Sequence, residues 1–375
     1  MVAAAVAADA RAAVAAIAAV AAAVAAVAGK QPFNCIEGPE AFPGLLVFSP
    51  RFARAARQLA LAGLLGALAM AARAQNVDPA IANRDERVLQ PYEPITGGYT
   101  FDSDDAPYVD VALSLKLRVL PIKWTTPGRL YVTFSTRFGF YLGTRESSPV
   151  IGKSYNPKLL WRYLPNESDR RNSSYGKPGV LDEFAQYFDI AYAHQSNGQS
   201  IHTPLQYQAA EQEAVLEGES ADRANEYISR GWDYFEGVWK HSWGREQRIA
   251  SYLDLRYFLE DGFLQGRAEE YNSWENDPQG KPRRAVDGLG ALVEFQWPFR
   301  MDHDQMAVVS NPSVWVKYQT GYDTPFRFNT VRLELGVQIL ELPFAVWVQK
   351  GYVSDLANYY RDVKSVGVEL RFGSF

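Results

Sequence analysis

Apolar and polar residues alternate along most of the chain beyond Gln75, in runs of about ten residues. In the clearest run, 109–119, the odd positions are all Val or Leu, and the even positions are Asp, Ala, Ser, Lys and Arg. Successive side chains of a β-strand point to opposite faces, so this run predicts a strand with one apolar and one polar face. Runs of the same kind occupy 129–142, 248–258 and 289–297.

The polar faces of these runs carry full charges, among them Asp110, Arg118, Arg137 and Asp254. A soluble β-sandwich also alternates, but its close-packed core does not hold unpaired charges. Strands that are apolar outside and charged inside are typical of a transmembrane β-barrel, whose closed sheet leaves no backbone group unpaired in lipid. The repetition of the pattern therefore favours a barrel.

We count eleven such runs, and a weaker one at 94–101 makes twelve, an even number as in bacterial outer-membrane barrels. The sequence predicts an all-β fold, a transmembrane antiparallel β-barrel of about 12 strands over residues 94–375, preceded by a periplasmic segment at 75–93. With periplasmic termini, 195–230 becomes an external loop, whereas the long polar stretch 165–184 departs from the rule of short periplasmic turns. The strands are expected at 108–120, 129–142, 157–164, 185–194, 231–242, 247–259, 285–298, 305–320, 330–340, 343–353 and 363–372.

The first 74 residues predict export rather than a folded domain. Residues 1–50 begin with an alanine-rich tract. Residues 51–74 combine a positive region (Arg51, Arg54 and Arg57), an apolar stretch and Ala72-Arg73-Ala74, which is the pattern of a cleaved signal peptide. A signal preceded by so long an extension is unusual, and initiation at Val47 is one explanation. The single cysteine, Cys35, precedes the cleavage site, so the mature chain would have no thiol chemistry.

Composition narrows the function classes. The formal net charge of −5 argues against a nucleic-acid partner, which calls for a basic surface. The mean hydropathy is negative, which argues against a helical multi-span membrane protein. Aromatic residues are plentiful, at 13% of the chain.

Candidate chemistry appears at His194 and Ser196, which follow the strand-like run 187–193. If the strand continues, both side chains share the face that carries Phe188, Ile190 and Tyr192. A serine needs a base within hydrogen-bond reach to become a nucleophile, and a third group must orient the histidine. A His-x-Ser spacing is a weak signal alone, because a polar rim where the strand leaves the membrane gives the same pattern.

A family resemblance strengthens the catalytic interpretation. His194-Gln195-Ser196-Asn197-Gly198 followed by Ser229-Arg230-Gly231-Trp232-Asp233 resembles the bacterial outer-membrane phospholipase A family. The resemblance extends to Glu146-Ser147-Ser148-Pro149, to Tyr155-Asn156-Pro157, and from Gly351-Tyr352 to Asp362, and so spans most of 90–375. It implies a twelve-stranded barrel with its active site on the lipid-facing exterior. It also implies an outer-membrane, calcium-dependent phospholipase A1/A2 and lysophospholipase that is active as a homodimer.

The resemblance assigns roles residue by residue. Ser196 would be the nucleophile, His194 the general base, and Asp233 the third member, where the family has Asn. The Gly198 N–H and a Ca²⁺ ion would stabilise the oxyanion. The calcium ligands would be the Ser229 side chain, the Gln199 carbonyl, where the family has Arg, and the carbonyl of Ser147 of the partner subunit.

The segment 201–228 is an insertion relative to the family pattern, and its Ala- and Glu-rich part, 209–227, predicts a surface helix. It would cap the site, govern dimer assembly or, as we favour, extend into solvent. His202, His241 and His303 are expected to be structural or solvent-facing. Two other functions stay open: a lipid A deacylase, which also uses a His-x-Ser motif, and a non-enzymatic pore or structural barrel.

Overall fold

The computed structural model describes residues 88–103, 106–121, 128–141, 150–164, 185–243, 248–265, 281–303, 306–340 and 342–372. The predicted N-terminal extension (1–50), the signal peptide (51–74), most of the segment 75–93, Ser147 and the stretch 165–184 lie outside these residues.

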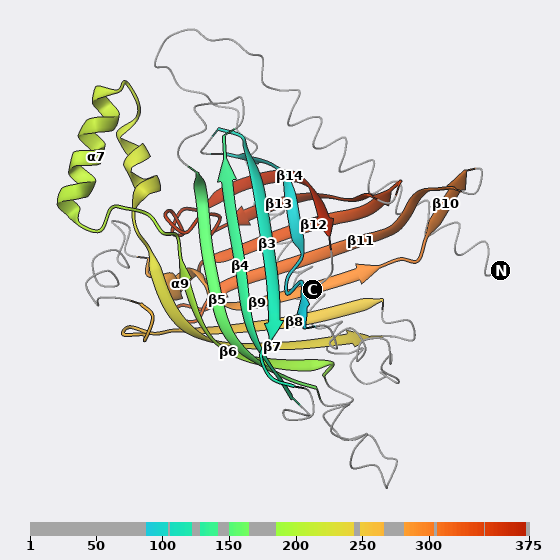
Figure 1. The fold of residues 1–375 in the computed structure, drawn as a ribbon. Helices are drawn as coiled ribbons and strands as arrows, with labels where there is room; N and C mark the ends of the chain where they lie inside the picture. Colours follow the sequence, from blue (N-terminus) through green and yellow to red (C-terminus); the bar gives the residue numbers. More distant parts are fainter. Residues whose placement is uncertain are drawn as a thin grey trace. The chain divides into compact units, whose positions relative to one another are not determined.

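The described residues form a closed antiparallel β-barrel (Figure 1). Its sheet has fourteen strands, and twelve of them form the ring, because β1 and β10 pair only at its margin. Neighbours in the ring follow chain order. The last strand, β14, pairs with the first, β2, and closes the ring, with Phe372 opposite Ile95. The ring strands are β2 (Ile95–Asp102), β3 (Tyr108–Arg118), β4 (Gly128–Phe140), β5 (Ile151–Tyr163), β6 (Tyr187–Ser196), β7 (Gly231–Trp243), β8 (Ile249–Phe258), β9 (Gly288–Gln296), β11 (Met306–Gly321), β12 (Asn329–Ile339), β13 (Leu342–Gly351) and β14 (Val363–Phe372).

The wall of the barrel is apolar outside and polar inside. In β3, Leu113, Leu115 and Leu117 are 43–46% exposed, whereas Ser114 and Lys116 between them are 3% and 5% exposed. The inner charges pair across strands, as Lys158 Nζ does with Glu236 Oε2 at 2.6 Å. A surface that exposes leucine and buries lysine suits an apolar solvent, so the predicted transmembrane β-barrel fold is confirmed.

Strands β1 (Leu89–Gln90) and β10 (Arg300–His303) were not predicted, and both are short additions to the ring. β5 begins at Ile151, six residues before the predicted start at 157. Pairing with β4 carries β5 to this point, although Gly152 has a φ of 56° and a bulge interrupts the register between Arg137 and Gly139. The local alternation is broken there, so pattern alone missed the start of the strand.

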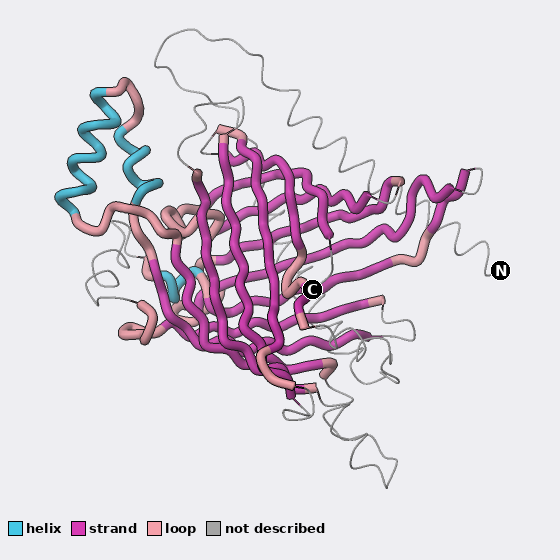
Figure 2. Tube along the Cα trace, viewed as in Figure 1, coloured by secondary structure: helices cyan, strands magenta, loops and turns pink. Residues whose placement is uncertain are grey.

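Helices are confined to the connections between strands, as Figure 2 shows. α7 (Pro204–Leu216) and the 3₁₀ helix η2 (Ala221–Tyr227) form the insertion after β6, and α9 (Arg283–Val286) precedes β9. No helix of the described ranges is long and apolar enough to cross a membrane. Beneath the end of β6, the barrel mouth is filled by a cluster that includes Trp232, Tyr234, Phe258 and Tyr359. This packed cluster supports the strand ends that carry the candidate site.

Candidate active site

His194 and Asp233 face each other across β6 and β7. The register pairs the two residues directly, and His194 Nδ1 lies 2.6 Å from Asp233 Oδ1. The Asp233 side chain is fully buried, and the His194 side chain is 18% exposed. Their face of the wall also carries Ile190 and Phe235, which are 68% and 51% exposed. The pair therefore lies on the outer, apolar wall of the barrel.

The Asp233 carboxylate is surrounded by hydrogen-bond donors. His194 bonds Oδ1, while Oδ2 accepts the Tyr192 hydroxyl and the Leu264 N–H, the latter at 2.5 Å. A carboxylate only accepts, so the hydrogen of the bond to His194 is on Nδ1. This bond leaves Nε2 as the basic nitrogen of the imidazole.

The turn after β8 folds back over Asp233. The Asp233 carbonyl accepts the Leu259 N–H at 2.8 Å, and its own N–H donates to Gln265 Oε1 at 3.1 Å. The Phe263 N–H donates to the Tyr192 hydroxyl at 2.8 Å. Gly262 packs so closely that a Cβ there would lie 2.1 Å from Asp233 Cβ. Only glycine fits this contact, and the turn excludes water from the carboxylate.

Ser196 ends β6 on the same outer face as His194 and is paired with Gly231 of β7. A Cβ at Gly231 would lie 3.5 Å from His194 Cε1 and 3.6 Å from Ser196 Cβ. Both side chains therefore border one open space that the glycine leaves. Within the described residues, Ser196 Oγ makes no hydrogen bond to His194. Such contacts are often long without substrate and tighten in the reactive complex.

Asn197 joins the end of β6 to the segment before β7. Its side chain is 1% exposed, donates to the Ile228 carbonyl at 2.8 Å and accepts the Arg230 N–H at 2.9 Å. Its own N–H donates to the Arg230 carbonyl at 3.1 Å. Gly198 follows with a φ of 58°, a conformation that favours glycine. Asn197 is thus a structural member of the five-residue segment His194–Gly198, the pentad, and the sequence predicted no role for it.

The predicted calcium ligands of this chain, Gln199 and Ser229, lie on the two segments that Asn197 joins. A carbonyl and a hydroxyl oxygen are hard, neutral donors of the kind that Ca²⁺ accepts together with water. The described ranges contain no cluster of His, Cys, Asp or Glu suited to a metal. The residues present therefore fit a weak, neutral calcium site completed by other oxygens, and Ser147 lies outside the described residues.

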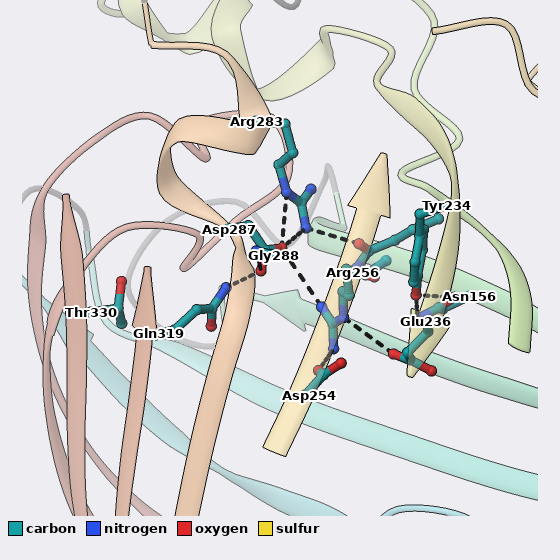
Figure 3. Close-up of polar contacts among 12 residues, drawn as sticks. Asn156, Tyr234, Glu236, Asp254, Arg256, Arg283, Asp287, Gly288, Gln319 and Thr330 are labelled. Atoms are coloured by element: carbon teal, nitrogen blue, oxygen red, sulfur yellow. Dashed lines mark hydrogen bonds and ion pairs between the residues drawn. The ribbon is translucent and has the colours of Figure 1, made fainter. Parts of the chain in front are cut away.

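Behind the pentad, Gln195 points inward and meets a polar network in the barrel mouth. Gln195 Oε1 accepts from Arg283 Nη2 at 2.9 Å, and Gln195 Nε2 donates to Ser154 Oγ at 2.9 Å. Arg283 is held in turn by Asp287, at 2.6 Å and 3.1 Å. Arg256 lies on the other side of the same carboxylate (Figure 3). The strand that presents His194 outward is thus anchored from inside.

Asp287, which lies between α9 and β9, is ionised within this network. Its burial acts to raise the pKa, but the guanidiniums of Arg283 and Arg256 outweigh burial and lower the pKa of Asp287 to about 2. The Gly288 N–H also donates to the carboxylate, at 2.8 Å. The carboxylate therefore carries its charge throughout the physiological pH range.

The insertion forms a helical arm, but its boundaries differ from the prediction. α7 begins at Pro204 rather than 209, because Thr203 and Gln206 form a capping box, and it ends before Gly218, which has a φ of 80°. Thr203-Pro204 and Gln206 are a readable helix start that composition alone missed. A parallel bridge between Ile201 and Ile228 closes the base of the arm. The pentad and the block at 229–233 are adjacent despite the insertion.

The structure also describes the three other histidines of the chain. His241 is 3% exposed between Trp239 and Trp243, with ring centroids at 6.0 Å and 4.1 Å. His202 precedes the arm helix, and His303 ends β10 in an exposed position. Their positions agree with the structural or solvent-facing roles expected of them.

Comparison with known proteins bears on the fold. No family model matches the chain, and no curated protein matches its sequence. Among solved structures, outer membrane phospholipase A from Escherichia coli matches with a TM-score of 0.52 and 16% identity, over 77% of this chain and 100% of that one. The Salmonella typhi outer membrane phospholipase dimer with bound calcium matches with a TM-score of 0.52 and 16% identity, over 81% and 96%. The KdgM porin matches with a TM-score of 0.28 and 9% identity, over 75% and 99%. At these identities, the likeness to the phospholipases establishes a shared outer-membrane barrel fold.

Proposed function

We propose that this protein is an outer-membrane phospholipase that hydrolyses acyl esters of glycerophospholipids with Ser196 as nucleophile. The observation that carries the proposal is the 2.6 Å contact between His194 and the buried Asp233, on the apolar wall and on the same face as Ser196. A hydrolase site that faces lipid rather than the barrel interior suits a substrate that resides in the membrane. The barrel likeness to outer membrane phospholipase A supports this interpretation.

The reaction follows from the roles of the three side chains. His194 Nε2 removes the proton of Ser196 Oγ as the oxygen attacks the acyl carbonyl carbon. The tetrahedral adduct collapses to an ester on Ser196, and the leaving lysophospholipid oxygen takes the proton from His194. Water, deprotonated by His194, then releases the fatty acid and restores the serine. Asp233 holds the Nδ1–H throughout and stabilises the imidazolium that forms twice per cycle.

The oxyanion of each tetrahedral adduct needs donors that are in place before the reaction. We assign the Gly198 N–H to this role, since Asn197 fixes the backbone on which it lies. Gln199 and Ser229 would hold a Ca²⁺ ion beside it, with Ser147 of the partner subunit as a further ligand in a homodimer. Bound calcium would supply positive charge at the developing oxyanion.

The direct test is labelling by a sulfonyl fluoride, which modifies an activated serine. Purified protein in mixed micelles with calcium should release fatty acid from phosphatidylcholine and incorporate one label, at Ser196. Ser196→Ala should abolish both. Ser200→Ala is the matched control, because Ser200 is exposed four positions away, and it should keep both. Labelling at another serine, or fatty-acid release by Ser196→Ala, would refute the assignment.

The same preparation separates the alternatives. A lipid A deacylase would release acyl chains from lipid A in preference to phosphatidylcholine. A pore would give large, stable conductance in planar bilayers without fatty-acid release. Chemical cross-linking with and without calcium would test the dimer independently of activity.

A further inference from the structure

The outer wall has a gap two rows from the candidate site. The sheet register places outward-facing residues in rows, and the row of His194 and Asp233 is followed by Tyr192, Phe235 and Tyr257. The next row is Ile190, Gly237, Leu255 and Leu289, so glycine stands between large apolar residues. A Cβ at Gly237 would meet no atom within 4 Å. A glycine inside a strand often marks a place where another group approaches closely.

The gap is the floor of a groove of about 450 Å³. The groove is open to the surrounding medium. The groove lies on the lipid-facing surface, and its exposed lining is almost entirely apolar, with Ile190, Phe235, Leu255, Tyr257 and Leu289 among the residues that form it. Side chains of this kind recognise a hydrocarbon chain by contact, without hydrogen bonds.

The groove begins at the row that follows His194 and Asp233, because Phe235 belongs to both the groove and that row. The rings of Phe235, at the upper wall of the groove, and Tyr192 are 5.5 Å apart, and the Tyr192 hydroxyl bonds the Asp233 carboxylate. An acyl chain that reaches from Ser196 into the groove therefore crosses the row of Tyr192 and Phe235.

The depth of the groove fits the tail of a long acyl chain. Ile190 is six residues from Ser196 along β6, which is about 20 Å in an extended strand and about 15 Å in depth at the usual barrel tilt. One leaflet contributes about half of a hydrocarbon core of about 30 Å. A long chain with its ester at Ser196 thus ends at the level of Gly237, and a chain of half that length does not reach it.

We propose that this groove is the subsite for the distal half of the substrate's acyl chain, and that Gly237 determines acyl-chain length preference. The inference rests on the proposed phospholipase function and adds a specificity element to it. The medium around the barrel is itself apolar, so the groove gains little from hydrophobic transfer. The groove acts instead through close packing, which holds the acyl chain in place while its ester lies at Ser196. This effect applies only to long chains, because short chains do not reach the groove.

The test is Gly237→Leu, which fills the groove with a side chain that meets no neighbouring atom at its Cβ. The readout is the ratio of kcat/KM for dipalmitoyl to that for dioctanoyl phosphatidylcholine, in the same detergent micelles with calcium. The ratio should fall about five-fold or more, because the leucine side chain displaces the distal half of the long chain from its packing against the groove. Gly237→Ala should give a smaller fall in the same direction, and it replaces the leucine variant should that one fail to assemble.

Gly97→Leu is the matched control. Gly97 also stands on the outer face of its strand with no atom within 4 Å of a Cβ, but on β2, five strands around the ring from β7. Its ratio should equal that of the unaltered protein. A ratio that is unchanged by both alanine and leucine at Gly237, in an active enzyme, overturns the groove proposal and leaves the phospholipase function standing. An unaltered protein that hydrolyses neither lipid refutes the proposed function, and the groove proposal with it.

Discussion

The environment of Asp233 predicts that Asp233→Asn impairs this protein, although asparagine is the residue that the outer-membrane phospholipase A pattern has at this position. All three groups around the carboxylate are donors: His194 Nδ1, the Tyr192 hydroxyl and the Leu264 N–H. An amide has one acceptor oxygen and one donor nitrogen, so it satisfies only part of this set.

Both orientations of the amide carry a cost. If its oxygen faces His194, its NH₂ group faces the Leu264 N–H, and two donors oppose each other. Of the surrounding groups, only the Tyr192 hydroxyl can rotate its hydrogen away and accept a hydrogen bond from the amide. If its oxygen faces Leu264, the NH₂ group faces His194 Nδ1, which must then accept, and the imidazole proton moves to Nε2, where the base is needed. A buried polar group without a partner costs about 1–3 kcal/mol, so kcat/KM should fall about five- to hundred-fold.

The assay compares phospholipid hydrolysis by the unaltered protein, Asp233→Asn and Asp233→Ala, with the folded fraction measured by circular dichroism. Asp189→Asn is the control for the loss of a buried carboxylate on a neighbouring strand, because Asp189 pairs with Arg162 inside the barrel at 2.7 Å. It should lower stability and leave the turnover of the folded fraction unchanged. Turnover by Asp233→Asn equal to that of the unaltered protein would show that the surrounding donors do not select a carboxylate.

Three further predictions concern neighbouring groups. Gly231→Val should lower kcat about ten-fold or more without preventing barrel assembly, because its side chain would enter the space that borders His194 Cε1 and Ser196 Cβ; hydrolysis rates of the refolded variant test this. The folded-state pKa of Asp287 is about 2, below its ordinary value of 3.8. Its contribution of about 2 kcal/mol to the free energy of unfolding is therefore present above about pH 4 and is lost as the pH falls towards 2. Denaturant unfolding should show Asp287→Asn to be less stable than the unaltered protein near neutral pH and equally stable in acid. Ser229→Ala should raise the calcium concentration for half-maximal hydrolysis about ten-fold, as a calcium titration would measure, whereas an unchanged titration would remove Ser229 from the ligand set.

The barrel could be predicted from the sequence, because a strand with one face in lipid and the other in a polar interior alternates regularly between apolar and polar residues. The positions of His194, Ser196 and Asp233 on the outer face followed from the same parity, and the structure places them there. The pattern failed where pairing rather than side-chain polarity extends a strand, as at Gly152 and Lys153 in β5.

The partners of Asp233 could not be predicted in the same way. Tyr192 looked like one more aromatic residue on an apolar face, and Leu264 contributes only its backbone N–H, for which no residue type is required. Gly262 follows Asp261 in a turn signal, but the signal does not reveal that the turn folds back onto β7. Contacts of this kind depend on loop paths, which leave little mark on composition or periodicity.

Neighbouring residues of the pentad face two different environments, the apolar exterior and the polar interior of the barrel. His194 and Ser196 face the apolar exterior, whereas Gln195 between them faces the interior network through Arg283 and Ser154. Polar side chains at the outer face cannot be anchored by lipid, so the rigidity that the proposed catalysis requires must come from groups behind and beside the strand. Here the interior ion pairs hold the backbone and the turn after β8 holds Asp233, so His194 keeps its orientation. A barrel wall that is braced by interior ion pairs is therefore a suitable scaffold for the proposed chemistry on its outer surface.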